Sequence, residues 1–438
     1  MKPLLYATRF LVMTLVIAWF ALAYAVGRIG AAFAGDAEKR RAAVARLRGQ
    51  ILRRAMTTLG ATFVKLGQVM STRPDLLEPE TIDELRALQD RVPAFPIAKV
   101  RRILEEDLGA PVGARFAELD DTPLAAASVA QVHRARLLTG REVAVKVLRP
   151  DVHARVERDG AILGLFARLL ALHPTLRLSD PVGHLEHLFA GILAQTDLRL
   201  EAANYVRFRA AFADVAGVRF PEVLPELSAT RVMTMELLRG TKLDALPPGD
   251  HGALAKRLQL VFLKMCFEDG FVHADLHPGN MLLTHEGDIA IFDVGLVKHL
   301  SPQIHEQYID FSRCLAMGAT SDFVDHIRRY HAYSGELDWA ALEKDLDRML
   351  GRFRAQNVAE LELGELMNEI LALGRRYRAR PLADMALVMV AMVTAEGIGK
   401  QLNPHANLFE DTAAFLGPLL ARKAAAAAAS SAAPPITP

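Results

Sequence analysis

The stretch HADLHPGNMLLTHEGDIAIFDVG, residues 273–295, carries the pattern that decides the fold. It begins as a loop rich in Pro and Gly, in which Asp275 and Asn280 are five positions apart. Two short apolar runs follow, separated by His-Glu-Gly-Asp, and this pattern predicts a small β-hairpin. Directly after the hairpin comes an Asp-Val-Gly sequence that begins at Asp293. The stretch therefore places three polar side chains at the two ends of one hairpin.

These residue types match the needs of phosphoryl transfer. A loop Asp, an Asn five residues later and an Asp-x-Gly after a hairpin follow the order of the catalytic segment of protein kinases. Transfer of a phosphoryl group needs a divalent metal that neutralises the phosphate oxygens, and Mg²⁺ prefers hard oxygen ligands. Asn280 and Asp293 can supply an amide oxygen and a carboxylate oxygen to the metal. Asp275 can orient an attacking hydroxyl or water and accept its proton.

The histidines of the same loop allow a second interpretation. His273, Asp275 and His277 alternate along the chain and could converge on a zinc ion, but no further Cys or His follows at metal-ligand spacing. We therefore expect His273 to brace the loop, and we leave His277 out of the catalytic set.

Residues 122–150, TPLAAASVAQVHRARLLTGREVAVKVLRP, predict a second hairpin with its turn at Thr-Gly. Alternation along the second strand puts Ala144 and Lys146 on the face opposite the valines. Val-Ala-Val-Lys matches the lysine strand of kinases, so Ala144 would lie against a nucleotide base while Lys146 reaches the phosphates. Such a lysine needs an anionic partner, and Glu201, on a helix predicted over 182–213, is the best candidate. Without the other motifs, Lys146 would be interpreted as an exposed lysine of a strand and Glu201 as a solvated carboxylate of a helix face.

The turn before this hairpin departs from the expected glycine-rich form. Ala125, Ala126, Ala127 and Ser128 stand where a phosphate-binding loop normally has glycines. Each alanine adds a Cβ and favours helical backbone angles, by roughly 1 kcal/mol per residue relative to glycine. We therefore expect a stiff loop that restricts closure over a triphosphate.

A further strand is predicted over 231–238, and residues 218–224 are expected to pair with it. In a two-lobed kinase the segment after this strand links the lobes, and its backbone groups bind the adenine edge. Met235 and Glu236 end this strand, and Leu237 and Leu238 would lie in the linking segment, so that Met235, Glu236 and Leu238 are candidate nucleotide-binding residues.

Composition limits the class of protein. The chain has 438 residues, of which 51% are hydrophobic and 24% charged, as in a globular protein with two or three domains. The net charge is only +1, so the overall charge does not indicate binding to nucleic acid. The two cysteines, Cys266 and Cys314, cannot form a disulfide framework and are expected to be buried thiols.

The N-terminus predicts a membrane anchor. Residues 10–27 contain 18 uncharged residues, which as a helix would span roughly 27 Å. A signal peptide is the main alternative, because Ala-Phe-Ala at 32–34 resembles a cleavage site, and a buried helix of a globular domain is a third. Two basic residues precede the run and eight follow it between Arg28 and Arg54, so the positive-inside rule places the rest of the chain in the cytoplasm.

Several segments resemble the UbiB-type atypical kinases, also called the AarF or coenzyme-Q kinase-like family. They are FVKLGQVMSTRPDLLE (63–78), AAASVAQVH (125–133) with VAVKV (143–147), DLRLEAANY (197–205), and HADLHPGN (273–280) with FDVG (292–295). The resemblance is strong over residues 60–300 and continues more weakly through VTAEGIGKQLNP (393–404). The Lys-x-Gly-Gln element from Lys65 to Gln68 is its most specific part, because ordinary kinases have no counterpart.

The resemblance implies an α+β, two-lobed protein-kinase-like fold that binds ATP and Mg²⁺ through the residues named above. It also implies that the segment around Lys65 and Gln68 packs over the active site, where a protein substrate would otherwise dock. By the same resemblance the alanine-rich loop replaces the glycine-rich one. The implied role is in ubiquinone or isoprenoid-lipid metabolism at the inner membrane, with membrane lipid or quinone-pathway components as partners.

The resulting domain hypothesis has five parts. They are a single-pass membrane anchor over 1–34, a helical extension over 35–112, an N-lobe over 113–240, a helical C-lobe over 241–420 and a low-complexity tail over 421–438. The alanines of the tail could extend a helix, which the two prolines at 434–435 would end, and we expect the end of the tail to be disordered.

Two positions depart from the family pattern. The family usually has Glu-x-Asp before the helix glutamate, whereas this chain has Gln195 and Asp197, so that one carboxylate is an amide. Val294 replaces the usual Phe of the Asp-Phe-Gly sequence. Neither change removes one of the candidate metal or phosphate ligands.

Two other functions remain open at this point. A small-molecule kinase of the aminoglycoside or choline type uses a similar catalytic loop, although the Lys65–Gln68 element and the alanine-rich loop argue against it. A nucleotide-binding pseudokinase that acts as a scaffold would keep the fold without turnover. All the polar site residues are present in the sequence, which argues for an enzyme.

Overall fold

The structure is a computed structural model of the whole chain, and it falls into two compact units. The residues that it describes are 2–31, 37–71, 77–88, 93–172, 181–247, 249, 251–274, 276–317, 319–333, 336–355, 363–380, 383–406 and 408–431. The first unit contains residues 1–212, 220–238 and 293–296, and the second contains 213–219, 239–292 and 297–438. The chain therefore passes between the units five times, and three of these crossings lie beside segments that carry candidate site residues.

The sheet of the first unit is antiparallel and is built around the predicted lysine hairpin. Its main path runs β1 (Phe116–Leu119), β3 (Ala130–Leu137), β4 (Glu142–Leu148) and β6 (Val232–Glu236), with β2 (Ala125–Ala126) paired to β3. The turn between β3 and β4 contains Gly140 at φ 86°, a left-handed conformation that glycine adopts without strain. The predicted hairpin is therefore confirmed.

The alternation of β4 separates the core from the site. Val143, Val145 and Val147 are fully buried and pack with residues of α5 (Ile97–Leu108) in one apolar cluster. Successive side chains of a strand point to opposite faces, so Ala144 and Lys146 lie on the other face. Burial of the valine face fixes the register, because a slip of one residue would put Lys146 into the apolar core.

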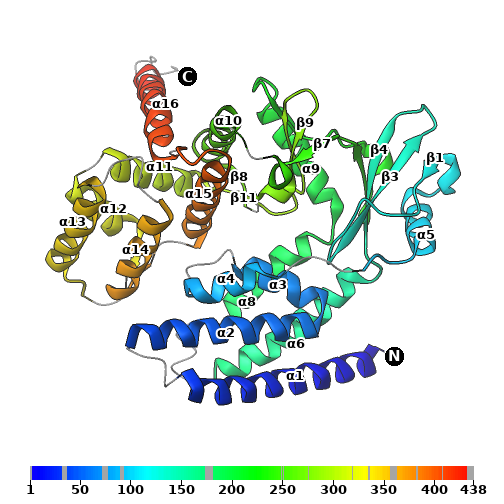
Figure 1. Cartoon of the computed structure of the whole chain (residues 1–438), viewed down its shortest axis with the longest axis horizontal. Helices are drawn as coiled ribbons and strands as arrows, with labels where there is room; N and C mark the ends of the chain where they lie inside the picture. The colour runs from blue at the N-terminus through cyan, green and yellow to red at the C-terminus, as the bar shows by residue number, and fades with distance from the viewer. Residues whose placement is uncertain are drawn as a thin grey trace, which may run out of the picture. The chain divides into compact units, whose positions relative to one another are not determined.

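Helices make up the rest of the first unit. The N-terminal helices are α1 (Lys2–Ala31), α2 (Ala37–Leu59), α3 (Ala61–Ser71) and α4 (Pro79–Arg86), and α6 (Val152–Leu170), α8 (Pro181–Ala194) and α9 (Leu198–Ala211) follow the sheet. α1, α2 and α3 lie side by side (Figure 1). The helix predicted over 182–213 is divided into α8 and α9 by a short turn.

The second unit contains the catalytic-loop stretch and three small sheets. One has the strand order β5 (Val218–Arg219), β10 (Ile289–Ile291), β9 (Met281–Thr284) and β7 (Gly240–Lys242). β8 (Phe271–His273) pairs with β11 (Val297–His299), and β12 (Ala332–Tyr333) pairs with β13 (Ala379–Arg380). β9 and β10 form the hairpin predicted from the first stretch. Gly240 has no room for a side chain, because a Cβ there would lie 2.2 Å from the Leu283 carbonyl oxygen.

The remainder of the second unit is helical. α10 (Gly252–Leu263) continues into a π-helical segment, Lys264–Asp269. The later helices are α11 (Pro302–Met317), α12 (Thr320–Tyr330), α13 (Trp339–Ala355), α14 (Leu363–Arg376), α15 (Ala383–Leu402) and α16 (Leu408–Ser431). They share one large apolar core, which includes both cysteines as buried free thiols. The alanines of the tail continue α16 as far as Ser431.

The expected pairing of residues 218–224 with 231–238 is confirmed only in its second half. Val223 forms an antiparallel bridge with Met235, and backbone hydrogen bonds of 2.8 Å join Leu224 to Thr234 and Glu236 to Glu222. The first half, β5, pairs instead with β10 of the second unit, in parallel. Pro221 interrupts the segment, and proline has no N–H to donate to a strand ladder. β6 therefore uses β4 as its strand partner.

Candidate active site

A buried ion pair lies at the centre of the site in the first unit. Lys146 of β4 donates from Nζ to both carboxylate oxygens of Glu201 in α9, at 2.7 and 2.8 Å. Only 12% of the Lys146 side chain and 6% of the Glu201 side chain are exposed. The structure thus brings together the lysine and the anionic partner expected from the sequence.

Asp293 adds a second carboxylate to the same lysine. Its Oδ1 lies 3.1 Å from Lys146 Nζ, and half of its side chain is exposed. The backbone of Asp293 has φ 51°, a left-handed conformation uncommon for residues other than glycine. Non-glycine residues in such a conformation require support from their surroundings. Asp293 is therefore a constrained residue whose carboxylate remains open to a ligand.

The support for Asp293 comes from α9. The hydroxyl of Tyr205 accepts a hydrogen bond of 2.9 Å from the Asp293 backbone N–H. The side-chain amide of Asn204 donates to the Val294 carbonyl at 2.9 Å. Sequence analysis missed both residues, although the signal was present, because Glu201, Asn204 and Tyr205 are spaced i, i+3 and i+4 and must share one helix face.

The charges of the cluster shift one another's proton affinities. Burial alone would lower the pKa of Lys146, but the charges of Asp293 and Glu201 outweigh it and raise the pKa, so the ammonium stays protonated. Burial raises the pKa of Glu201, although the charges of Lys146 and, less strongly, Lys65 oppose this. Burial also raises the pKa of Tyr205, which remains a neutral phenol. The lysine is thus a permanent cation beside two acids.

The Lys65–Gln68 element lies in α3 and contributes a second buried cation. The side chain of Lys65 is buried, and its charge acts on Glu201. Gln68 donates from Nε2 to the Leu88 carbonyl at 3.3 Å, and its Oε1 has no hydrogen-bond partner among the described residues. A Cβ on Gly67 would lie 2.3 Å from a methyl group of Leu88 and 2.5 Å from the Met56 sulfur, so a larger residue there would require these side chains to move. Within the first unit, α3 therefore places Lys65 near the Lys146–Glu201 pair.

The two residues that precede α9 have local roles. Asp197 caps the helix by accepting a hydrogen bond of 3.1 Å from the Arg199 N–H. Hydrogen bonds from the Arg199 side chain lower the pKa of Asp197, so it stays ionised. Gln195 donates to the Gly191 carbonyl of its own helix at 3.4 Å. The structure gives Gln195 no contact with Lys65 or Glu201.

The alanine-rich loop is a strand turn. Ala125 and Ala126 pair with Val132 and Gln131 of β3, and the Ala127 N–H donates to the Ala130 carbonyl at 2.8 Å. The expected stiffness therefore has a different cause: strand pairing restrains this loop, and helical preference does not. Ser128, at the turn itself, is fully buried.

The predicted base-binding and linking residues lie on and after the sheet. Ala144 is 4% exposed and pairs with Met235 of β6. Glu236 ends β6 and accepts a hydrogen bond of 3.3 Å from the Glu222 N–H. The chain passes from the first unit to the second after Leu238, so the expected linking segment lies at a unit boundary.

The loop after β8 belongs to the second unit. His273 is fully buried, and its Nε2 lies 3.3 Å from the Phe292 carbonyl oxygen, which is the bracing role expected for it. His277 accepts from the Gly279 N–H at 3.2 Å and so shapes the turn that contains Asn280. The Asn280 carbonyl accepts a hydrogen bond of 2.8 Å from the Phe292 N–H. Asp275 lies outside the described residues.

Two of the candidate metal ligands lie among the described residues. Asp293 offers an exposed carboxylate and Asn280 an amide oxygen, and hard oxygen ligands suit Mg²⁺. Among the residues that the structure describes, no three His, Cys, Asp or Glu side chains group as a metal site. The two oxygen donors come from different units, with Asp293 in the first and Asn280 in the second.

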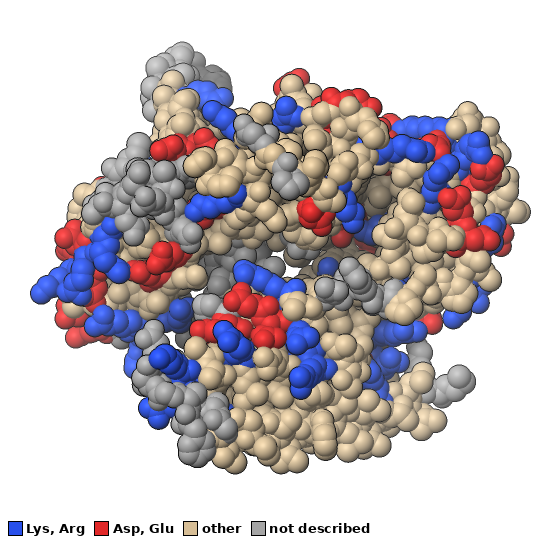
Figure 2. Space-filling view, in the orientation of Figure 1, with Lys and Arg blue, Asp and Glu red and all other residues tan. Residues whose placement is uncertain are grey.

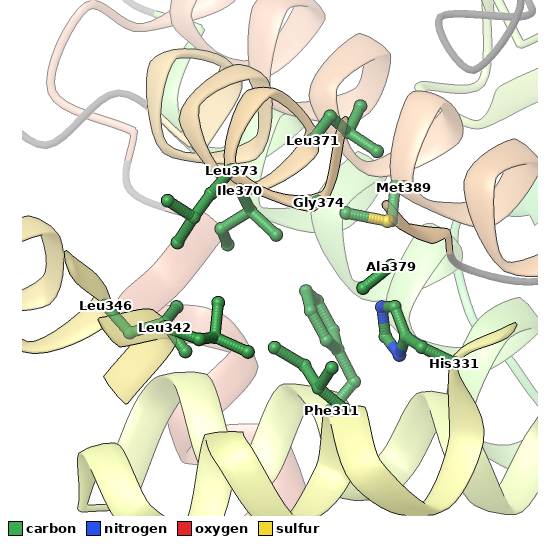
Figure 3. Close-up of a pocket in the computed structure, with 11 residues that line it drawn as sticks. Phe311, His331, Leu342, Leu346, Ile370, Leu371, Leu373, Gly374, Ala379 and Met389 are labelled. Carbon is green, nitrogen blue, oxygen red and sulfur yellow. The ribbon is translucent and has the colours of Figure 1, made fainter. Parts of the chain in front are cut away.

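A separate apolar pocket lies in the helical part of the second unit (Figure 3). Its lining includes Phe311, Leu342, Ile370 and Met389, and the ring of His331 points into it. Nδ1 of His331 is buried without a hydrogen-bond partner among the described residues. This lining offers no charged group to a phosphate, so the pocket is unrelated to the nucleotide chemistry.

Comparison with known proteins gives two family matches. A model described as the ABC1 atypical kinase-like domain matches residues 87–323, and one described as the UbiB helical domain matches residues 346–407. The first match covers the sheet of the first unit, α9, the catalytic-loop stretch and Asp293. The second covers α14 and α15 with the end of α13.

Individual relatives agree with these matches. A protein of Aeromonas salmonicida named "Probable protein kinase UbiB" is 33% identical over 388 residues, which are 84% of this chain and 70% of the relative. A protein of Vibrio cholerae with the same name is 32% identical over 394 residues, or 86% of this chain and 71% of the relative. The solved structure of Rv3197 with erythromycin, from Mycobacterium tuberculosis, covers 72% of this chain and 84% of its own, with a TM-score of 0.47 and 22% identity.

Proposed function

Because the chain belongs to the UbiB-type family of ABC1 atypical kinases, we propose that it is a membrane-associated kinase or ATPase that uses ATP and Mg²⁺. We further propose that this activity supports ubiquinone or isoprenoid-lipid metabolism, at a cell membrane and with its catalytic part in the cytoplasm. The observation that carries the proposal is the buried Lys146–Glu201 pair with Asp293 within 3.1 Å of the lysine.

Each residue of this cluster has a separate task in the proposed reaction. Lys146 holds the phosphates, and Glu201 fixes the ammonium in place through two short hydrogen bonds. When bound, Mg²⁺ would neutralise charge on the phosphate oxygens, with Asp293 and Asn280 as its protein ligands. Asp275 would orient the attacking hydroxyl or water and accept its proton. Tyr205 and Asn204 position Asp293 and touch no reacting atom.

The charge balance of the cluster supports binding of a polyanion. Lys146 and Lys65 are buried cations, and Glu201 is the buried acid on which both charges act. Asp293 is the exposed acid. If Asp293 binds a divalent metal, Lys146 loses one of its two acidic partners. The lysine then has a free donor for a phosphate oxygen.

A nucleotide-binding scaffold without turnover is the second candidate. Lys146 occupies Oδ1 of Asp293, one of the two oxygens that a metal could use. A protein that kept this contact when nucleotide binds would not position the metal for transfer. Steady ATP hydrolysis by the full-length chain, in detergent or lipid, would exclude the scaffold. A screen with aminoglycosides and choline as acceptors would test for a small-molecule kinase.

The experiment that tests the proposal compares two Asp→Asn variants. Asp293→Asn keeps the size of the side chain and removes the charge that would face Mg²⁺, so turnover of ATP should collapse. Asp83→Asn is the matched control, because Asp83 lies in α4 with an exposed side chain that pairs with the exposed Arg86. Unchanged ATP turnover in Asp293→Asn would contradict the proposal.

The metabolic part of the proposal needs a separate measurement. Quinone and lipid profiles of a deletion strain should be restored by the wild-type chain and not by Asp293→Asn. Full restoration by Asp293→Asn would show that the pathway does not depend on this site.

A further inference from the structure

Helix α1 has two distinct faces along its whole length. The less exposed residues recur every three or four positions and face the rest of the unit: Arg9, Met13, Val16, Phe20, Ala23, Tyr24 and Gly27. A second row is apolar and exposes more than half of each side chain: Leu4, Leu11, Leu15, Trp19, Leu22, Val26 and Ile29. Both rows follow helical spacing, so the apolar row forms one continuous stripe away from the covered face.

The N-terminal half of α1 is fixed to the unit through a buried charge. Arg9 donates to both carboxylate oxygens of Asp159 in α6 at 2.8 Å, and to the Leu59 carbonyl at 2.9 Å. The Asp159 side chain is only 2% exposed. Next to this pair, the rings of Phe10 and Phe166 stack with their centroids 5.4 Å apart. Separation of α1 from the unit would leave Asp159 buried without its counter-charge.

The C-terminal half of α1 is fixed through close packing on α2. A Cβ on Gly27 would lie 2.8 Å from a methyl group of Leu47, so the two helices approach closely there. α2 is itself fixed in the unit, because Thr81 of α4 donates to the Ala45 carbonyl at 2.9 Å. α1 therefore lies along the unit from Arg9 to Gly27.

The helix beside α1 cannot enter a membrane. α2 carries Arg40, Arg41, Arg46, Arg48, Arg53 and Arg54 within its length. Arg48 and Arg53 pair with Glu78 and Glu84, at 2.8 and 3.3 Å, which ties them to the polar part of the unit. Charged side chains are costly in the hydrocarbon of a bilayer. A helix packed along α2 cannot cross the bilayer unless it leaves α2.

We propose that α1 lies in the plane of a membrane surface, with its apolar stripe in the lipid and its covered face on the unit. α6, which contacts α1 at Phe166, extends the apolar surface with exposed Leu165 and Leu169. Figure 2 shows uncharged residues along the edge where Figure 1 places α1. This inference rests on the membrane association proposed above, and it replaces a helix that crosses the bilayer with one that lies on it.

Charge identifies the partner as a bilayer with anionic headgroups. The first 59 residues contain ten basic and two acidic residues. Arg28, Arg40, Arg41 and Arg46 are exposed. The apolar stripe of α1 therefore lies beside basic residues that are mainly on α2, and basic residues next to an apolar surface are attracted by anionic lipid at the headgroup boundary. A second copy of the chain would bring the same positive charge to the surface and repel it.

The depth of Trp19 distinguishes the two arrangements. Trp19 is 67% exposed on the apolar stripe and lies near the middle of the apolar span Leu4–Ile29. The full-length chain is reconstituted with phosphatidylethanolamine and phosphatidylglycerol brominated at different depths along the acyl chain. Bromine near the headgroup should quench Trp19 most strongly if α1 lies in the plane. Strongest quenching by bromine at the chain end would show a spanning helix and overturn the proposal, as would no quenching at all. Trp19→Phe supplies the control, because its remaining emission comes from Trp339.

Labelling of the N-terminal end gives an independent test in membranes of expressing cells. Leu5→Cys reports the start of α1 and Arg40→Cys reports the start of α2, while the native cysteines are buried. An impermeant maleimide should label both variants in vesicles of the same orientation. Labelling of Leu5→Cys only in vesicles of the opposite orientation would show that α1 crosses the membrane.

The apolar stripe itself can be weakened without disturbing the covered face. Leu15→Ser combined with Leu22→Ser should reduce binding to anionic vesicles by about tenfold or more, because two large apolar side chains leave the lipid. ATP turnover of the same variant in detergent should equal that of the wild type, which separates this result from a failure of the proposed enzyme. Vesicle binding equal to the wild type would contradict the membrane assignment.

Discussion

Two buried ion pairs of the first unit differ in the number of carboxylates that each cation contacts. Arg9 donates hydrogen bonds to both carboxylate oxygens of Asp159 and to one backbone carbonyl. Lys146 is instead shared between Glu201 and Asp293, and Asp293 is half exposed. A saturated pair can only hold helices together. A pair with a third, accessible charge can exchange one partner for a ligand. Both pairs are buried, so the feature that distinguishes the candidate active site is the additional, solvent-accessible carboxylate of Asp293.

The largest effect is expected from breaking the Lys146–Glu201 pair. Lys146→Met removes the cation that is hydrogen-bonded to the buried Glu201, which should lower the free energy of unfolding by about 3–5 kcal/mol. ATP turnover should fall by on the order of 100-fold or more, because the donor to the phosphates is gone. Denaturant unfolding and a steady-state ATPase assay measure the two effects.

A double variant separates folding from chemistry at this pair. Lys146→Met with Glu201→Leu removes both charges and should recover most of the lost stability, while ATP turnover stays low. Recovery of turnover in the double variant would show that Lys146 has no role in the reaction.

Breaking the Arg9–Asp159 pair should affect folding alone. Arg9→Met leaves the Asp159 carboxylate buried, and we expect a loss of about 2–3 kcal/mol, less than for Lys146 because Arg9 is 21% exposed. Thermal unfolding measures the loss, and ATP turnover of the folded variant should be unchanged. A matching loss of turnover would mean that the two pairs are coupled.

His331 offers a contrast, because it is a buried titratable group with no counter-charge. Burial, aided by the charge of His326, lowers its pKa from 6.5 to about 4. The unfolded chain therefore binds the proton first on acidification, and stability is lost as the pH falls from about 6.5 to about 4. The loss should be about 3 kcal/mol, with further contributions from His133 and His326, whose pKa values burial also lowers.

The control for this pH dependence is His331→Leu. The variant lacks the titrating ring, so its free energy of unfolding should change less between pH 7 and pH 4.5 than that of the wild type. Identical pH dependence in the two proteins would show that His331 is not the group responsible.

The smallest effect is expected at the alanine-rich turn. Ala126→Gly weakens the β2–β3 pairing and loosens the loop, by about 1 kcal/mol, so ATP or ADP affinity should change by about fivefold. The change should depend on Lys146, because both elements act on the same phosphates. Calorimetry on Ala126→Gly and on the double variant with Lys146→Met would reveal that dependence. Equal affinities in wild type and Ala126→Gly would place the loop away from the phosphates.

The sequence predicts the site best where a motif combines residue type with fixed spacing. Val-Ala-Val-Lys, the loop Asn and Asp-Val-Gly locate Lys146, Asn280 and Asp293 without any structure, and the pairing of Lys146 with Glu201 is confirmed. Asn204 and Tyr205 escape such reasoning, because their partners are backbone groups of a segment almost 90 residues away.

The parts of the fold that could not be predicted depend on partners far along the chain. The sequence pattern predicts a strand at residues 218–219, but it does not identify β10 as the strand with which they pair. The apolar run of α1 predicts contact with lipid by composition alone. The covered face of that helix depends on Asp159, 150 positions later, and a hydropathy window contains no information about that pair.

The central claim is that Lys146, Glu201 and Asp293 form a site for ATP and Mg²⁺. Calorimetric titration of ATP into the full-length chain, with and without Mg²⁺, tests it most directly in wild type, Asp293→Asn and Asp83→Asn. The wild type and Asp83→Asn should bind ATP more tightly with Mg²⁺ than without it, and Asp293→Asn should lose that metal dependence. Equal metal dependence in all three proteins would contradict the account.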